Sequence, residues 1–196
     1  MTHLLGLTGS IGMGKSTTAA MFRDAHIPVW DADAVVHALY GKGGGAVTPM
    51  RQAFPDAVEG DAISRDMLKQ IIAKDPSALE AIENIVHPLV AKDRAAFIAA
   101  HDDPLLVFDI PLLYETNADQ WLDTVLVVSA SPADQRARVL ARPGMTIPQF
   151  EAMLERQMPD AEKRRRADHL IETQTLDQTR NAVRELIEQL KGHPNA

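Results

Sequence analysis

A glycine-rich segment near the beginning of the chain has the residue types and spacing of a phosphate-binding loop. Residues 9–16 read Gly-Ser-Ile-Gly-Met-Gly-Lys-Ser, which matches the pattern G-x-x-x-x-G-K-[ST]. In such a loop the glycines let successive backbone N–H groups converge on phosphate oxygens, and the N-terminus of the following helix attracts the same anion. Lys15 would reach the β- and γ-phosphates, and Ser16 would offer its hydroxyl to Mg²⁺. The alternative is a turn without a ligand, but the apolar run before the loop and the helical pattern after it favour nucleoside triphosphate binding.

Two aspartates follow the second apolar run of the chain, at residues 27–30. Asp31 and Asp33 are two residues apart, so in an extended stretch both would face the phosphate site at the carboxyl edge of a parallel sheet. Either could instead cap the helix that follows. The nearby loop favours Asp33 as the group that orients an acceptor hydroxyl, with Asp31 as the cap or the strand end.

A third aspartate, Asp109, follows the apolar run at residues 105–108 and would reach the same edge. It could bind the hydration shell of Mg²⁺ or cap the turn that follows, and the residues leave both interpretations open. His87 precedes a proline and is more typical of a helix boundary than of a ligand. No two histidines have the spacing of a metal site.

The region from Arg136 to Arg166 is basic within an acidic chain. Its eight basic and four acidic residues give it a charge of 8 − 4 = +4, whereas the whole chain has −7. One interpretation is a solvated helical face. The other is a lid whose arginines stabilise the charge that develops on the γ-phosphate and whose closure excludes water. Arg138 and Arg142 would share a helical face if that helix continues, and Pro143-Gly144 could act as a hinge.

The elements that would position these residues alternate between apolar runs and helical patterns. We expect strands at residues 4–8, 27–30, 105–108 and 125–128, and a short one at 170–171. Fully apolar runs are typical of strands buried on both faces of a parallel sheet. The alternation therefore predicts an α/β fold with a mostly parallel sheet.

Helices are expected between and after these strands. The patterns predict helices at residues 15–25 and 31–40, an amphipathic helix at 176–191, and caps at Ser131 and at the Thr146–Gln149 pair. Residues 46–102 show no convincing strand. There Asp75-Pro76 predicts a helix start, His87 a helix end before Pro88, and Pro88 a further helix to about residue 100. Three helices between the second and third strands would form an insertion.

Composition excludes several classes of protein. The chain has 196 residues, 45% of them hydrophobic and 24% charged, which excludes a disordered or fibrous chain. The absence of cysteine excludes disulfide scaffolds and thiol nucleophiles, and the net charge argues against nucleic acid or a membrane as partner. No N-K-x-D or D-x-x-G signature of a regulatory GTPase is present. A cytoplasmic protein, with a monomer favoured, is the expectation.

The ordered set of motifs resembles the dephospho-CoA kinase family, whose members phosphorylate the ribose 3′-hydroxyl of dephospho-CoA with ATP. The resemblance extends over nearly the whole chain. The chain departs from the family's pattern at His169–Thr173, where an Asn-containing turn is usual. This departure affects the contacts that the resemblance implies around the ATP base. The matching residues are 8–16, Asp31-Ala32-Asp33, His87-Pro88, residues 111–115, Gln135, Arg138, Arg142, Gln157 and Ala167-Asp168.

The resemblance implies a P-loop core at residues 1–32, 103–137 and 166–196, a helical acceptor-binding domain at 33–102, and a helical lid at 138–165. It implies Mg²⁺ as cofactor, and ATP and dephospho-CoA as partners. Lys15, Asp33 and Arg142 would be catalytic, with Asp33 on the acceptor hydroxyl and Arg142 on the transferring phosphate. His87 and Leu112 would join Asp33 on the acceptor side, and Ser16 and Asp109 would serve the metal. The ATP-binding residues would be Gly9, Ser10, Ile11, Gly12, Met13, Gly14, Lys15, Ser16, Thr17 and Arg138.

Two other functions fit the same loop. A kinase of the shikimate-kinase type also pairs a P-loop with D-x-D after the second strand, but here Gly43-Gly44-Gly45 follows a helix rather than a third strand. A nucleotide-gated binding module without transfer activity is the second alternative. Such a sensor needs no carboxylate on the acceptor side, so Asp33 argues against it.

Overall fold

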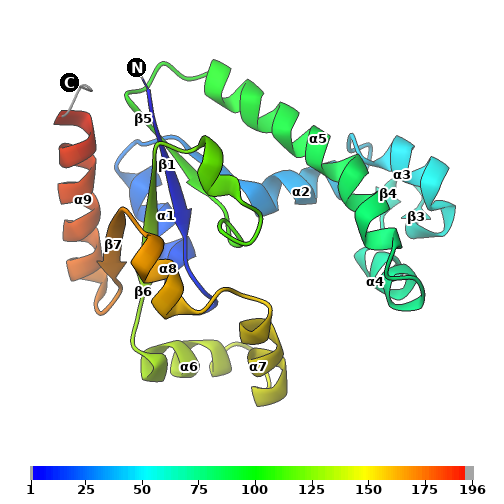
Figure 1. The fold of residues 1–196 in the computed structure, drawn as a ribbon. Coiled ribbons are helices and arrows are strands. Elements are labelled where there is room, and N and C mark those ends of the chain that lie inside the picture. The colour runs from blue at the N-terminus through cyan, green and yellow to red at the C-terminus, as the bar shows by residue number, and fades with distance from the viewer. Residues whose placement is uncertain (1, 193–196) are drawn as a thin grey trace. The chain divides into compact units, whose positions relative to one another are not determined.

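The computed structural model describes residues 2–192 of the chain (Figure 1). The outermost parts of the predicted core, residue 1 and residues 193–196, lie outside the described residues. The chain divides into two compact units, one formed by Met1–Trp30 with His101–Ala196 and the other by Asp31–Ala100.

A five-stranded sheet runs through the described part of the first unit, in the order β2-β5-β1-β6-β7. β1 pairs in parallel with both β5 and β6, and β6 pairs in parallel with β7, which confirms the predicted α/β fold. β2 begins one residue after Pro28, since proline cannot donate a ladder hydrogen bond. The strands are β1 His3–Thr8, β2 Val29–Asp31, β5 Leu105–Asp109, β6 Thr124–Ser129 and β7 His169–Glu172.

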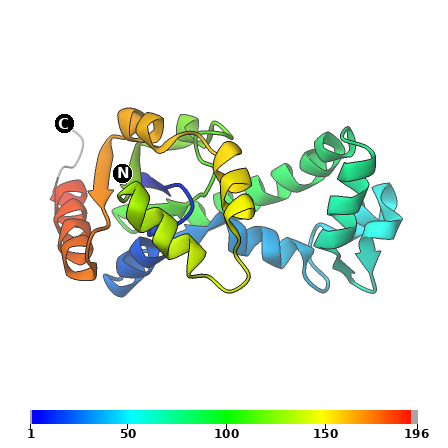
Figure 2. The same ribbon diagram turned by 90° about the horizontal axis from the view of Figure 1, so that it is seen from below.

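Helices α1 (Lys15–Asp24) and α9 (Leu176–Gly192) share one core with the sheet (Figure 1). Phe22 of α1 and Val183 of α9 are almost fully buried in it. Three helices follow β6, as Figure 2 shows: α6 (Pro132–Leu140), α7 (Ile147–Glu155) and α8 (Asp160–Arg166). A short helix, η2 (Ala118–Trp121), precedes β6. The predicted caps of α6 and α7 are confirmed. Within residues 2–192 no helix has both the length and the apolar character needed to cross a membrane.

The second unit surrounds its own hydrophobic cluster, in which Met50 and Ile82 are buried. Two predictions for this region are wrong: a short hairpin, β3 with β4, is present, and two helices that were not expected, α3 and α4, flank it. Strands of two residues are too short to leave a periodic pattern. The elements are α2 Ala32–Tyr40, α3 Val47–Ala53, η1 Pro55–Ala57, β3 Val58–Glu59, β4 Ala62–Ile63, α4 Arg65–Lys74 and α5 Ala78–Ala99.

The helix α5 continues through Pro88, so the predicted break at His87 is wrong. Proline removes one backbone donor and disfavours helical geometry before it. However, Val86, before the proline, and Val90, after it, pack into the same cluster, and this shared burial holds both halves in one helix. The predicted start is also displaced, because Asp75 accepts hydrogen bonds from the N–H and hydroxyl of Ser77 and the helix begins at Ala78.

Candidate functional site

The glycine-rich loop lies where β1 ends and α1 begins. Gly12 and Gly14 have φ values of 80° and 90°, which L side chains rarely adopt. A Cβ on Gly14 would also lie 3.0 Å from Thr173 Oγ1. Since Gly14 is the N-cap of α1, the first N–H groups of that helix are available to an anion, and Ser16 and Thr17 in its first turn are exposed.

The structure brings Lys15 and Asp109 together. The Lys15 ammonium donates a hydrogen bond to Asp109 Oδ1, and the two side chains are 16% and 5% exposed. Asp109 is the last residue of β5, and Lys15 begins α1 after the loop that follows β1. Because β1 and β5 are parallel neighbours, both residues lie at one edge of the sheet. A positive and a negative group therefore meet beside the loop, shielded from most of the solvent.

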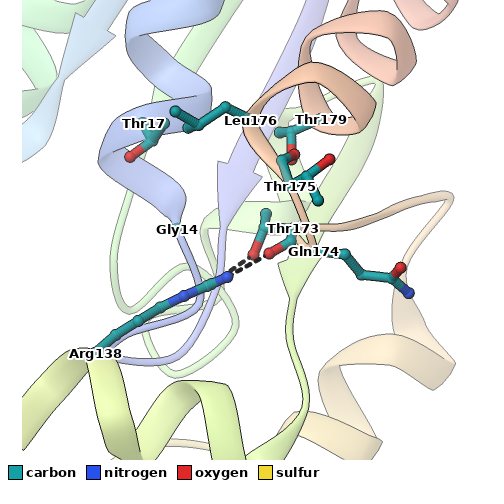
Figure 3. A pocket seen from close by; sticks show the side chains of 8 residues that line it. All are labelled: Gly14, Thr17, Arg138, Thr173, Gln174, Thr175, Leu176 and Thr179. Carbon is teal, nitrogen blue, oxygen red and sulfur yellow. Dashed lines mark hydrogen bonds between the residues drawn. The ribbon is translucent and has the colours of Figure 1, made fainter.

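A cavity of about 280 Å³ lies beside Gly14 and Thr17, where the loop joins α1 (Figure 3). Arg138 of α6 is one of its lining residues, and its Nη1 donates a 2.9 Å hydrogen bond to Thr173 Oγ1 while Nη2 donates to the Thr173 carbonyl. A planar guanidinium fixed in this way can stack on a flat ring. Thr173 belongs to the segment that the sequence relates to the ATP base, but no local pattern distinguishes the lining residues after it, and these were not predicted. The cavity is lined by Gly14, Thr17, Arg138, Thr173, Gln174, Thr175, Leu176 and Thr179.

Arg142 is not on the helix that carries Arg138, so the condition for a shared helical face, that this helix continues, is not met. α6 ends at Leu140, and Arg142 lies exposed just beyond it. The predicted turn at Pro143-Gly144 follows, with Gly144 at φ 77° and the Met145 N–H donating to the Arg142 carbonyl. Pro143 prevents the helix from continuing through Arg142, because proline disfavours helical geometry in the residue before it.

The predicted acceptor-side residues are divided between the two units. Asp31 Oδ1 accepts a hydrogen bond from the Ala34 N–H and caps α2, which confirms its expected role as cap. Asp33 is therefore not the cap, and its side chain is exposed in the first turn of α2. His87 is exposed on α5, and Leu112, in the first unit, is 39% exposed.

Part of the basic region is buried rather than solvated. Lys163 of α8 has no exposed side-chain surface, and its Nζ lies 2.8 Å from Glu115 Oε1. The same oxygen accepts a 2.7 Å hydrogen bond from the Met158 N–H. Burial would raise the pKa of Glu115, but the Lys163 and Met158 hydrogen bonds outweigh it and hold that pKa below its usual value. Arg165, by contrast, has a side chain that is 77% exposed, as a solvated face predicts.

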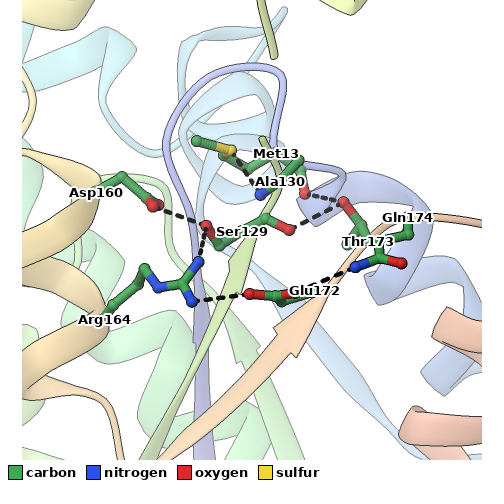
Figure 4. Close-up of polar contacts among 8 residues, drawn as sticks. All are labelled: Met13, Ser129, Ala130, Asp160, Arg164, Glu172, Thr173 and Gln174. Carbon is green, nitrogen blue, oxygen red and sulfur yellow. Dashed lines mark hydrogen bonds and ion pairs between the residues drawn. The ribbon is translucent and has the colours of Figure 1, made fainter. Parts of the chain in front are cut away.

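Further polar contacts fix α8 to the ends of two strands (Figure 4). Ser129 Oγ, at the end of β6, donates a 2.7 Å hydrogen bond to Asp160 Oδ2 and accepts one of 3.2 Å from Arg164. Arg164 also lies 2.8 Å from Glu172 Oε1 of β7, which lowers the pKa of that carboxyl. Most of the positive side chains of α8 are therefore paired with carboxylates of this chain.

We expect Glu115→Gln to destabilise the protein at neutral pH, because Lys163 stays buried without its counter-charge. Removing one partner of a buried pair typically costs on the order of 3 kcal/mol. The pKa of Glu115 is lower in the folded protein than in the unfolded chain, where it is about 4.3. The ionised carboxylate therefore contributes to stability above that unfolded-state pKa, and this contribution is lost as the pH falls through the folded-state pKa. Urea unfolding should show a difference between variant and wild type at pH 7 that shrinks at pH 4.

Glu162→Gln is the matched control, because Glu162 is 44% exposed and lies 3.7 Å from Arg165. Exposed pairs of this kind contribute about 0–1 kcal/mol. Equal destabilisation by the two substitutions would contradict a special role for Glu115.

Comparison with known proteins decides the family. The model of the family described as dephospho-CoA kinase matches residues 3–178. The chain belongs to the dephospho-CoA kinase family. Named dephospho-CoA kinases from Ruegeria pomeroyi and Jannaschia sp. are 57% and 58% identical to it over 191 residues. The alignments cover 97% of this chain and 97% and 98% of those relatives.

Solved structures share the fold of this family member. A crystal structure of TT1252 from Thermus thermophilus has a TM-score of 0.86 at 32% identity and covers 96% of this chain and 97% of its own. A dephospho-CoA kinase from Campylobacter jejuni has a TM-score of 0.72 at 22% identity and covers 98% of this chain and 99% of its own. A shikimate kinase from Acinetobacter baumannii has a TM-score of 0.55 at 11% identity, so the fold alone does not distinguish the two kinds of kinase.

Proposed function

We propose that the protein transfers the γ-phosphoryl group of ATP to the ribose 3′-hydroxyl of dephospho-CoA, giving CoA and ADP. The hydroxyl oxygen forms a bond to the γ-phosphorus, the bond from that phosphorus to the ADP oxygen breaks, and the hydroxyl proton is released. The observation that carries the proposal is a complete P-loop, with Lys15 beside Asp109, in a member of the dephospho-CoA kinase family. In a loose transition state the protein contributes mainly positioning and electrostatic stabilisation.

The loop supplies the groups that bind the triphosphate. We assign to this role the Lys15 ammonium, which Asp109 holds at the sheet edge until phosphate oxygens are present, and the backbone N–H groups of residues 9–17. The N–H groups of Ile11 and Met13 are excepted, because they donate to Gln157 Oε1 and to the Ser10 carbonyl. The cavity beside Arg138 suits a nucleotide base, because it combines a guanidinium plane with an apolar wall formed by Leu176.

Ser16 and Asp109 fit a magnesium ion held together with the phosphates. Both offer oxygen ligands, and Mg²⁺ is usually bound by one or two protein groups, phosphate oxygens and water. Within residues 2–192 no group of three or more His, Cys, Asp or Glu side chains could hold a metal alone, which agrees with a site completed by ATP. When bound, the ion would neutralise charge that develops on the phosphates.

The helical domain at residues 33–102 is proposed to bind the acceptor. Asp33 would orient the 3′-hydroxyl and receive its proton, and its exposure leaves it accessible to a ligand. The exposed His87 and Leu112 would contact the remainder of dephospho-CoA.

The segment 138–165 is proposed to act as a lid. Its C-terminal part, from Gln157 onward, is held by contacts with Ile11, Glu115 and Ser129, so closure would move mainly the residues between the end of α6 and Arg156. Closure would bring Arg142 to the γ-phosphate.

We expect Arg142→Lys to lower kcat by about 10²-fold, because lysine keeps the charge but loses the planar fork that binds two oxygens. Arg165→Lys, at a 77% exposed side chain, is the control and should leave kcat unchanged. Amide hydrogen exchange with and without a non-hydrolysable ATP analogue and acceptor should show new protection in residues 141–156. Unchanged exchange there, together with a fully active Arg142→Lys variant, would remove the lid from the proposal.

Incubation with Mg-ATP and separate acceptors tests the reaction itself. The acceptors are dephospho-CoA, shikimate and nucleoside monophosphates, and mass spectrometry shows which one gains a phosphate. Phosphorylation of dephospho-CoA alone is the expected result, whereas phosphorylation of shikimate would establish the alternative kinase. ATP binding without any transfer would favour a nucleotide-gated module.

The proposal places the enzyme in the cytoplasm as a monomer without a nucleic-acid partner. A net charge of −7 and the absence of cysteine support this environment. Light scattering at micromolar concentration should give the mass of one chain, 21.5 kDa.

A further inference from the structure

The peptide groups around Ile11, in the first half of the P-loop, are held on two sides by glutamine side chains. Gln157 Oε1 accepts a 3.0 Å hydrogen bond from the Ile11 N–H, and Gln135 Nε2 donates a 2.8 Å hydrogen bond to the Ile11 carbonyl. The two glutamines come from α6 and from the segment after α7, more than one hundred residues along the chain. The Ile11 N–H is therefore used by a side chain of the proposed lid segment.

Gln157 is itself held in place by its neighbour in the chain. The Met158 N–H donates to Glu115 Oε1 at 2.7 Å, and the fully buried Lys163 lies 2.8 Å from the same oxygen. Two residues further on, Asp160 accepts a hydrogen bond from Ser129. The backbone at residues 158–160 is therefore fixed to the core, and the side chain of Gln157 is presented to the loop from a rigid base.

The second half of the loop has a separate support (Figure 4). Thr173 Oγ1 donates a 2.8 Å hydrogen bond to the Met13 carbonyl, and Arg138 binds the same threonine. A loop with three glycines in six residues loses much conformational entropy when it is ordered, so it needs such contacts to keep one shape before a ligand arrives.

We propose that Gln157 is a positioning residue that holds the P-loop in its phosphate-binding conformation before ATP binds. Through Gln157 the anchored C-terminal end of the lid segment contributes to the affinity of the loop for ATP. Gln135 acts on the same residue from the opposite side. The inference rests on the P-loop as the ATP site and does not depend on the acceptor.

The test measures Mg-ATP binding by titration calorimetry without any acceptor, so its outcome is independent of the reaction proposed above. In Gln157→Met the Ile11 N–H loses its acceptor while the side chain keeps a similar length. One hydrogen bond changes the fraction of molecules whose P-loop is in the phosphate-binding conformation by up to about tenfold. We therefore expect the affinity for ATP to fall about three- to tenfold. We expect kcat at saturating ATP to stay within about twofold, since a preorganising contact acts on binding.

Gln120→Met is the matched control, because it makes the same chemical change at an exposed side chain of the same unit. Selective ¹⁵N-isoleucine labelling should show faster exchange of the Ile11 amide in ATP-free Gln157→Met but not in the control. The double variant with Gln135→Met should lose less affinity than the sum of the single losses, because both glutamines act on Ile11. The proposal is overturned if Gln157→Met binds ATP like the control, if its loss only matches a loss of global unfolding free energy, or if the two substitutions are fully additive.

Discussion

We expect Lys15→Ala to reduce kcat/KM by at least about 10²–10³-fold, the usual effect of removing one donor that stabilises developing charge. The ammonium lies at the sheet edge beside the loop, where it can reach the β- and γ-phosphates as ATP binds. Steady-state kinetics with dephospho-CoA measures the loss, and calorimetry with ATP separates weaker binding from slower transfer.

Lys15→Arg is the control for the fold. It keeps a positive charge beside Asp109, whose side chain is only 5% exposed, so folding should be preserved while the geometry at the phosphates is not. Urea unfolding of both variants identifies any loss of activity that arises from instability. Near-wild-type turnover in folded Lys15→Ala would remove the central claim about the P-loop.

The second large effect is expected for Asp33→Asn, with kcat lowered by about 10²–10⁴-fold and ATP affinity little changed. The structure removes the competing explanation, because Asp31 rather than Asp33 caps α2. A loss in Asp33→Asn would therefore reflect the loss of a carboxylate at the acceptor hydroxyl. The measurement is kcat for dephospho-CoA, combined with the ATP dissociation constant.

Asp31→Asn provides the comparison. Asparagine and aspartate cap helices about equally well, so this variant should retain most of its activity and stability. If Asp31→Asn reduced kcat as much as Asp33→Asn, the division of roles between the two aspartates would be wrong.

Several features of the site were predictable because their signals are local. The P-loop needs its glycines, lysine and serine within eight residues, and the strand before it and the helix after it are recognisable from apolar patterning. The caps at Ser131 and Thr146 were also predictable, since each bonds to a residue three positions away. The place of Asp109 at the carboxyl edge followed from the rule that parallel strands end together.

Other features could not be read in this way, because the deciding partner is distant along the chain. The charged helix α8 looks solvated by composition, yet Lys163 is buried, because Glu115 supplies its counter-charge from 48 positions earlier, 163 − 115 = 48. Pro88 ends a helix in most local contexts, but here Val86 before it and Val90 after it pack into one cluster.

The sequence by itself determined that this chain binds a nucleoside triphosphate at an α/β sheet edge, and its ordered motifs pointed to one kinase family. The reason is that phosphate binding depends on backbone N–H groups and residue types that are encoded within a single short segment. Only the tertiary structure decided what surrounds that segment. It placed Thr173 against Gly14 and Gln157 on the Ile11 N–H, contacts that span 146 residues or more, whose partners are fixed by packing rather than by spacing.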